Sequence, residues 1–201
     1  MITSSEAIQR LKDGNQRFVS GERNSNANQS QRENLVGGQA PFAIILGCSD
    51  SRVPAEIVFD QGLGDLFVIR VAGNIVAPSQ IGSVEFAAER FGTPLVVVLG
   101  HSMCGAVMAT IEELETSSQD ASHNIQSIVN RIRPSIEPLF RTELRNSPDK
   151  LLSAAINANI LAAANHLRHG SQTIERLVQQ GKLEIVSAEY SLETGRVMFF
   201  D

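Results

Sequence analysis

The sequence is poor in the residues that mark several protein classes: it has no tryptophan, one tyrosine and only two cysteines among 201 residues. Two cysteines are too few for the disulfide framework of a small secreted protein. No apolar run approaches the roughly 20 residues of a membrane-spanning helix. The stretch MITSSEAIQRLKDGNQRF lacks the apolar core of a secretory signal. We therefore expect a cytoplasmic protein with no membrane partner.

Positive charge is also scarce, because 17 Lys and Arg stand against 22 Asp and Glu, for a net charge of -5. A broad basic face is not expected, and neither is nucleic acid as a partner. The hydrophobic fraction of 42% is too high for a disordered chain. We expect residues 1–201 to form a single domain, with an N-terminal helix and arm over 1–38 and an α/β core over 39–201.

Apolar runs of strand length predict a mainly parallel sheet. Residues 42–46, 66–71 and 95–99 show little polar alternation, which is typical of strands covered on both faces. Residues 183–190 and 196–200 flank a Glu-Thr-Gly turn and predict strands near the C-terminus. The predicted fold class is α/β: a mainly parallel β-sheet flanked by helices, with an N-terminal helical arm and an additional C-terminal strand.

The N-terminal region predicts one helix followed by a polar arm. Thr3 and Glu6 fit a capping box at the start of a helix over residues 3–19. Residues 20–40 are rich in Asn, Ser and Gln and predict an extended arm, because they cannot bury much surface.

Further helices are predicted after the second and third strands. Residues 79–91 read as a helix with Ser79 as its N-cap. Residues 122–180 should be largely helical, with breaks at Pro134, Pro138, Pro148 and Gly170. A charged helix face, expected to be solvated, is formed by Glu112, Glu113 and Glu115.

Two clusters of reactive side chains follow predicted strands. Cys48, Asp50 and Arg52 alternate directly after one strand, and His101 and Cys104 follow another. Open α/β sheets place their sites outside the carboxyl ends of the strands. The two clusters should therefore meet in space.

One imidazole and two thiolates form a ligand set suited to zinc. His101 and Cys104 stand at i and i+3 and can point to one side of a helical turn. Three protein ligands leave a fourth position open, as in catalytic zinc sites. The alternative is that Cys48 and Cys104 are buried small hydrophobic residues and His101 is a hydrogen-bonded loop residue.

The segment CSDSRVPAEIVFDQGLGDLFVIRVAGNIV, followed by GSVEFA and GHSMCGAV, resembles the β-class carbonic anhydrases. The resemblance is dense over residues 39–107 and looser in SAEYSLETGRVMFF. It implies a single β-carbonic-anhydrase-like domain. It also implies one Zn²⁺ per chain, with Cys48, His101 and Cys104 as its ligands.

The resemblance further implies that Asp50 and Arg52 are the catalytic pair. The guanidinium fork of Arg52 can hold both carboxylate oxygens and keep Asp50 off the metal. Asp50 can then accept a hydrogen bond from zinc-bound water or hydroxide. If Asp50 instead becomes a metal ligand, the site is closed and inactive, and the family is known for both arrangements. The alternative is a surface Asp–Arg pair that caps a loop.

Four substrate-binding residues are also implied. Gln39 offers its side-chain amide, Gly105 offers a backbone N–H, and Phe67 and Phe86 supply an apolar wall across a subunit interface. Without the resemblance, both phenylalanines would be taken as core residues. The implied assembly is a homodimer or a dimer of dimers, in which the N-terminal helix and arm wrap around the partner.

The sequence departs from the bicarbonate-inhibited members of the family, which carry a Trp three residues before the first Cys. Ile45 stands there in this chain. This difference favours the plant-like subtype with a normally open site, whereas Tyr190 matches the bicarbonate-sensitive kind.

The predicted function is zinc-dependent, reversible hydration of CO2 to bicarbonate and a proton, by attack of zinc-bound hydroxide. Activity should rise with pH, because two thiolates make zinc a weaker Lewis acid than three imidazoles do. Alternatives are a hydrolase of carbon disulfide or carbonyl sulfide on the same scaffold, and a non-catalytic protein with structural zinc. Thiol redox catalysis is less favoured, since the cysteines form no C-x-x-C pair.

Overall fold

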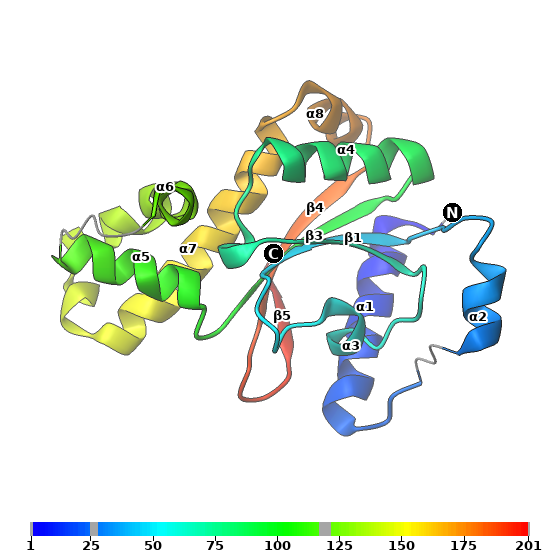
Figure 1. The fold of residues 1–201 in the computed structure, drawn as a ribbon, viewed down its shortest axis with the longest axis horizontal. Helices are drawn as coiled ribbons and strands as arrows, with labels where there is room; N and C mark the ends of the chain where they lie inside the picture. Colours follow the sequence, from blue (N-terminus) through cyan, green and yellow to red (C-terminus); the bar gives the residue numbers. More distant parts are fainter. Residues whose placement is uncertain (1, 25–27, 117–121, 201) are drawn as a thin grey trace.

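The computed structural model describes residues 2–24, 28–116 and 122–200, and a five-stranded sheet lies at its centre (Figure 1). The strands are β1 (Ala43–Gly47), β2 (Leu66–Arg70), β3 (Leu95–His101), β4 (Glu184–Tyr190) and β5 (Val197–Phe200). Their order is β2-β1-β3-β4-β5; the first four run parallel, and β5 returns antiparallel to β4. The predicted α/β fold with an additional C-terminal strand is confirmed.

The central strands β1 and β3 are buried along their whole length. Alternate side chains point to opposite faces of the sheet, so Ile44 and Leu46 join one apolar cluster while Ala43 and Ile45 join the other. Both faces must therefore be covered, which explains why these strands are nearly continuous apolar runs.

Helices cover the two faces unequally (Figure 1). The larger cluster includes α4 (Pro78–Phe91), α5 (Gly105–Thr116), α6 (His123–Ile136), α7 (Pro148–His169) and α8 (Gln172–Gln179). The smaller cluster lies under α1 (Ser4–Ser20) and α3 (Ala55–Val58). No helix in the described ranges is both long and apolar enough to cross a membrane.

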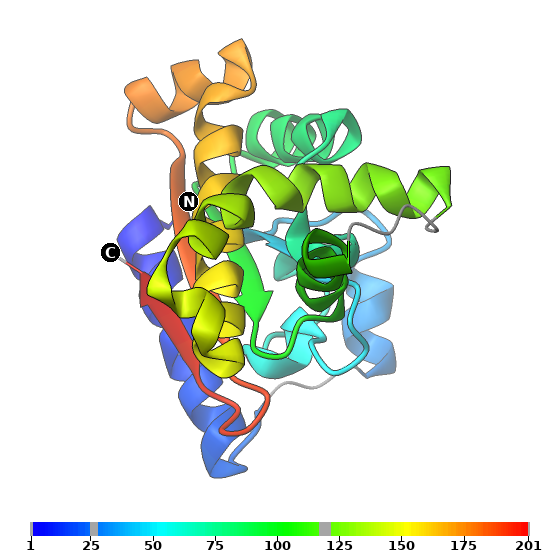
Figure 2. The same ribbon diagram turned by 90° about the vertical axis from the view of Figure 1, so that its left-hand side faces the viewer.

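The predicted capping box of the first helix is confirmed, because Thr3 and Glu6 each bond the other's backbone N–H. Helix α1 buries Leu11 against the sheet of its own chain. Figure 2 shows α1 beside β5, where the Asn15 amide donates to the Gly195 carbonyl at 2.9 Å and accepts from the Val197 N–H at 2.8 Å. This face of α1 is therefore buried within its own chain, and the wrapping of a partner by the helix and arm stays a prediction.

The sequence had suggested an extended arm over residues 20–40, but the arm is not extended throughout. It contains a short helix, α2 (Gln29–Asn34), because Asn28 and Gln31 form a second capping box. No residue of α2 is buried. Residues 25–27 of the predicted arm lie outside the described residues.

Two predicted helix signals are wrong. Ser79 does not cap α4, because Pro78 already occupies the first turn, where its fixed backbone angle suits a helix. Pro134 does not break α6, which continues to the buried Ile136. Pro134 is exposed, and the buried side chains of Ile132 and Ile136 on either side of it hold the helix on the core.

The other predicted breaks coincide with ends of elements. Pro138 lies in the 3-10 turn η2 (Glu137–Arg141), which is followed by η3 (Glu143–Asn146), while Pro148 begins α7 and Gly170 ends it.

The predicted solvation of the acidic face of α5 fails at one position. Glu113 is only 9% exposed, because Arg133 and Gln126 of α6 both donate to its carboxylate.

Candidate metal centre

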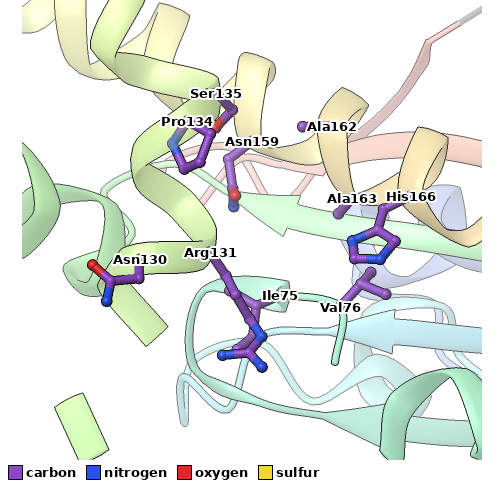
Figure 3. A pocket seen from close by; sticks show the side chains of 10 residues that line it. All are labelled: Ile75, Val76, Asn130, Arg131, Pro134, Ser135, Asn159, Ala162, Ala163 and His166. Carbon is purple, nitrogen blue, oxygen red and sulfur yellow. The ribbon is translucent and has the colours of Figure 1, made fainter. Parts of the chain in front are cut away.

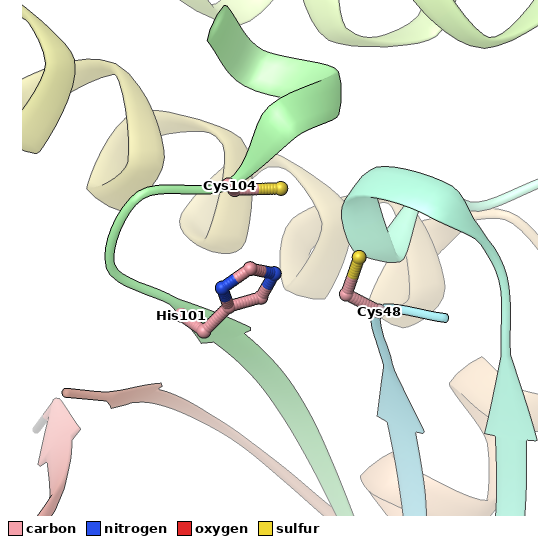
Figure 4. A group of neighbouring side chains, drawn as sticks. All are labelled: Cys48, His101 and Cys104. Atoms are coloured by element: carbon pink, nitrogen blue, oxygen red, sulfur yellow. The ribbon is translucent and has the colours of Figure 1, made fainter. Parts of the chain in front are cut away.

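Three predicted metal-binding side chains meet at the carboxyl ends of two adjacent parallel strands (Figure 4). Cys48 follows β1, His101 ends β3, and Cys104 precedes α5. Their potential ligand atoms all lie within 4.8 Å of one another, and all three residues are buried. The sheet therefore brings together residues that are far apart in the chain.

His101 is oriented for metal binding. Its Nδ1 lies 2.9 Å from the Ser102 carbonyl oxygen, so Nδ1 carries the proton and Nε2 keeps its lone pair. Nε2 is buried without a hydrogen-bond partner among the described residues. A buried polar atom left in this way is costly. A metal ion would satisfy it, and two thiols with one imidazole fit Zn²⁺.

The two cysteines are unequal acids. Hydrogen bonding from Cys104 lowers the pKa of Cys48, and the Gly73 N–H, 3.3 Å from Sγ, acts in the same direction. The pKa of Cys104 is raised by its interaction with Cys48 and by burial. Burial alone would lower the pKa of His101, but the Cys48 sulfur, the Ser102 carbonyl oxygen and Asp50 together raise it. Without a metal, the site thus favours one thiolate.

Asp50 is held by Arg52 through two side-chain bonds, from Nε to Oδ1 at 2.9 Å and from Nη2 to Oδ2 at 2.7 Å. The backbone N–H of Arg52 also donates to Oδ1 at 2.9 Å. These bonds from Arg52 hold the pKa of Asp50 well below its usual range. Oδ2 lies 3.8 Å from His101 Nε2. The carboxylate therefore stands beside the three potential ligands while paired with Arg52.

Arg70, which sequence reasoning missed, clamps the loop that carries these groups. Its Nε donates to the Cys48 carbonyl oxygen at 3.1 Å, and its Nη2 donates to that of Asp50 at 2.6 Å. Arg70 ends β2 in register with Gly47 of β1. The sequence did offer one signal for Arg70: it is an arginine at the end of a predicted strand, as Cys48 follows the end of another.

The predicted substrate residues are not gathered at this centre. Gly105 adjoins it, since it follows Cys104. Gln39 precedes β1, on the side opposite Cys48, and the strand between them spans about 15 Å at roughly 3.3 Å per residue. Phe67 pairs in register with Ile44, toward the same amino end.

Phe67 and Phe86 belong to an aromatic cluster with Phe91, in which ring centroids are 5.7 to 6.2 Å apart. Phe86 remains 54% exposed.

Ile45 and Tyr190, the two positions that distinguish the subtypes of the family, are buried in the cluster under α1 and α3. Tyr190 stands beside His101 in the sheet, and burial raises its pKa.

Comparisons with known proteins agree with this geometry. A family model described as carbonic anhydrase matches residues 43–197. Carbonic anhydrase 2 of Mycobacterium tuberculosis is 38% identical over 193 residues, which are 95% of this chain and 90% of the relative. The carbonic anhydrase of Mycolicibacterium smegmatis is 40% identical over 188 residues, which are 93% of this chain and 88% of the relative.

Solved structures show the same fold. The β-carbonic anhydrase CcaA matches with a TM-score of 0.75 and 26% identity, over 98% of this chain and 88% of that chain. The family match, the sequence relatives and the shared fold together show that the chain belongs to the β-class carbonic anhydrases.

Proposed function

We propose that this carbonic anhydrase hydrates CO2 reversibly with zinc held by Cys48, His101 and Cys104. The observation that carries the proposal is the buried, unpartnered Nε2 of His101 facing two buried thiols. When bound, zinc supplies the Lewis acidity that makes water a nucleophile near neutral pH, as in the three-histidine carbonic anhydrases. The two thiolates moderate that acidity.

Asp50 and Arg52 prepare the nucleophile. Because Arg52 keeps Asp50 ionised, the carboxylate is an acceptor only and can orient the attacking water through a hydrogen bond. Arg52 also holds the carboxylate oxygens away from a role as metal ligands. This arrangement supports a normally open site, the plant-like subtype.

The substrate pocket is proposed to combine two subunits. Gly105, at the start of α5, offers its backbone N–H beside Cys104. Gln39, Phe67 and Phe86 lie toward the other end of the sheet and would face the centre of a partner. The exposed ring of Phe86 and the unburied α2 arm support a homodimer, or a dimer of dimers built from it.

The first experiment is stopped-flow CO2 hydration by zinc-loaded protein, followed with a pH indicator. We expect activity that rises with pH, and its loss in the Asp50→Asn variant. Asp65→Asn is the matched control, because Asp65 also pairs with an arginine, Arg10 at 2.8 Å, but outside the metal centre. Zinc-loaded protein without hydration at any pH would contradict the proposal and favour the carbon disulfide or structural-zinc alternatives.

A further inference from the structure

A chain of two hydrogen bonds connects α7 to the metal centre. Asn159 of α7 is 3% exposed, and its Nδ2 donates to the Gly73 carbonyl oxygen at 2.9 Å. The N–H of the same Gly73 donates to Cys48 Sγ at 3.3 Å. One residue of the turn η1 (Ala72–Asn74) thus joins a remote helix to a potential ligand.

Only glycine fits this turn. Gly73 has a φ of 69°, in the left-handed region that favours glycine. A Cβ there would lie 2.7 Å from Ile132 Cδ1 and 3.0 Å from the Cβ of Ala106. Two polar contacts also hold the backbone of the turn: the Asn74 N–H donates to the Val71 carbonyl oxygen at 3.0 Å, and the Asn159 amide donates to the Gly73 carbonyl oxygen.

A cavity lies next to the turn, on the side of Asn159. Figure 3 shows Asn159 in a cavity whose walls include Ile75 and Val76, the two residues that follow the turn. The cavity has a volume of about 310 Å³. The cavity borders the residues that follow the turn and none of the turn itself, and the Asn159 side chain reaches from its wall to the Gly73 carbonyl oxygen.

We propose that Asn159 is a positioning residue of the metal centre: it fixes Gly73 so that the Gly73 N–H donates to the Cys48 thiolate. This inference rests on the proposed metal-binding function. An N–H donated to a ligating thiolate withdraws electron density from sulfur, and groups that orient ligands in this way typically change metal affinity 10- to 100-fold when they are removed.

The test replaces Asn159 with Ala, and with Leu, which resembles Asn in shape but cannot donate. Each protein is loaded with Co²⁺, whose thiolate-to-metal charge-transfer band reports on sulfur directly. We expect that band to shift in both variants and the zinc dissociation constant to rise about tenfold. Asn130→Ala is the matched control, because Asn130 lines the same cavity from α6. It should leave both readouts unchanged.

The outcomes separate this inference from the proposed function. If Asn159→Ala does not fold, the same two measurements on Asn159→Leu test the proposal. An unchanged charge-transfer band and zinc affinity in a folded Asn159 variant would overturn the positioning role, and so would an equal change in Asn130→Ala. If the wild-type protein shows no thiolate-to-cobalt band, the metal centre itself is refuted and the positioning role falls with it.

Discussion

Cys48 interacts through both its sulfur and its backbone carbonyl oxygen. Its sulfur meets Cys104, His101 and the Gly73 N–H, while its carbonyl oxygen accepts from Arg70. The sulfur contacts favour its thiolate, and the Arg70 contact fixes its backbone. Charge and position are therefore controlled separately at this residue, and each can be tested alone.

The charge of Cys48 predicts how the zinc-free protein titrates. A lowered pKa means that the thiolate is already present at neutral pH and disappears only on acidification, whereas an ordinary cysteine ionises near pH 8.5. We expect thiolate ultraviolet absorbance at neutral pH that is absent when both cysteines are replaced by serine. Cys104→Ser should retain it, because the serine hydroxyl can still donate to the Cys48 sulfur, as the Gly73 N–H does. Absorbance that emerges only in the alkaline range would contradict the assignment.

The position of Cys48 predicts the effect of removing Arg70. The glutamine in Arg70→Gln cannot reach both carbonyl oxygens, so we expect faster zinc release to a chelator. We also expect the free energy of unfolding to fall by about 1–2 kcal/mol, because charge-assisted hydrogen bonds are lost at an exposed site. Arg90→Gln, at an exposed site on α4, is the control and should change neither. Equal zinc release from the two variants would show that Arg70 does not hold the loop.

At the scale of elements, α5 and α6 are joined through a partly buried ion pair. Arg133→Ala should remove the charged partner of the nearly buried Glu113 and lower the free energy of unfolding by about 2 kcal/mol. This is less than the roughly 3–5 kcal/mol lost when a fully buried pair is broken, because Arg133 is a third exposed. Urea unfolding would measure it.

The control for this prediction is Arg176→Ala, which breaks the exposed pair between Arg176 of α8 and Glu89 of α4. Exposed pairs contribute about 0–1 kcal/mol. Similar losses in the two variants would show that burial does not distinguish the two pairs.

The elements also show what the sequence could predict. Strands β1 and β3 were recognisable because a strand buried on both faces must be apolar at every position. Asn159 was not, because it bonds a backbone group remote in the chain and leaves no local pattern, and Arg70 showed only its place at the end of a strand. Residue type located the potential ligands, but only tertiary contacts locate what orients them.

At the scale of the whole molecule, the sheet separates two parts of the proposed active site. Cys48 follows the carboxyl end of β1, and Gln39 precedes its amino end. One chain cannot bring both to one CO2 molecule, whereas a twofold axis can place the Gln39 of each subunit at the centre of the other. The proposed substrate pocket therefore requires assembly.

Co-expression of two inactive variants tests this arrangement. In a hybrid of Cys48→Ser with Gln39→Ala, the chain that retains Cys48 receives an intact Gln39 from its partner, so one site is complete. Random pairing makes half of the dimers hybrids, and we expect about one quarter of wild-type hydration activity. A hybrid of Cys48→Ser with Cys104→Ser is the control and should stay inactive, since each of its metal centres lacks a ligand. If the first hybrid forms and gains no activity, Gln39 does not act across the interface.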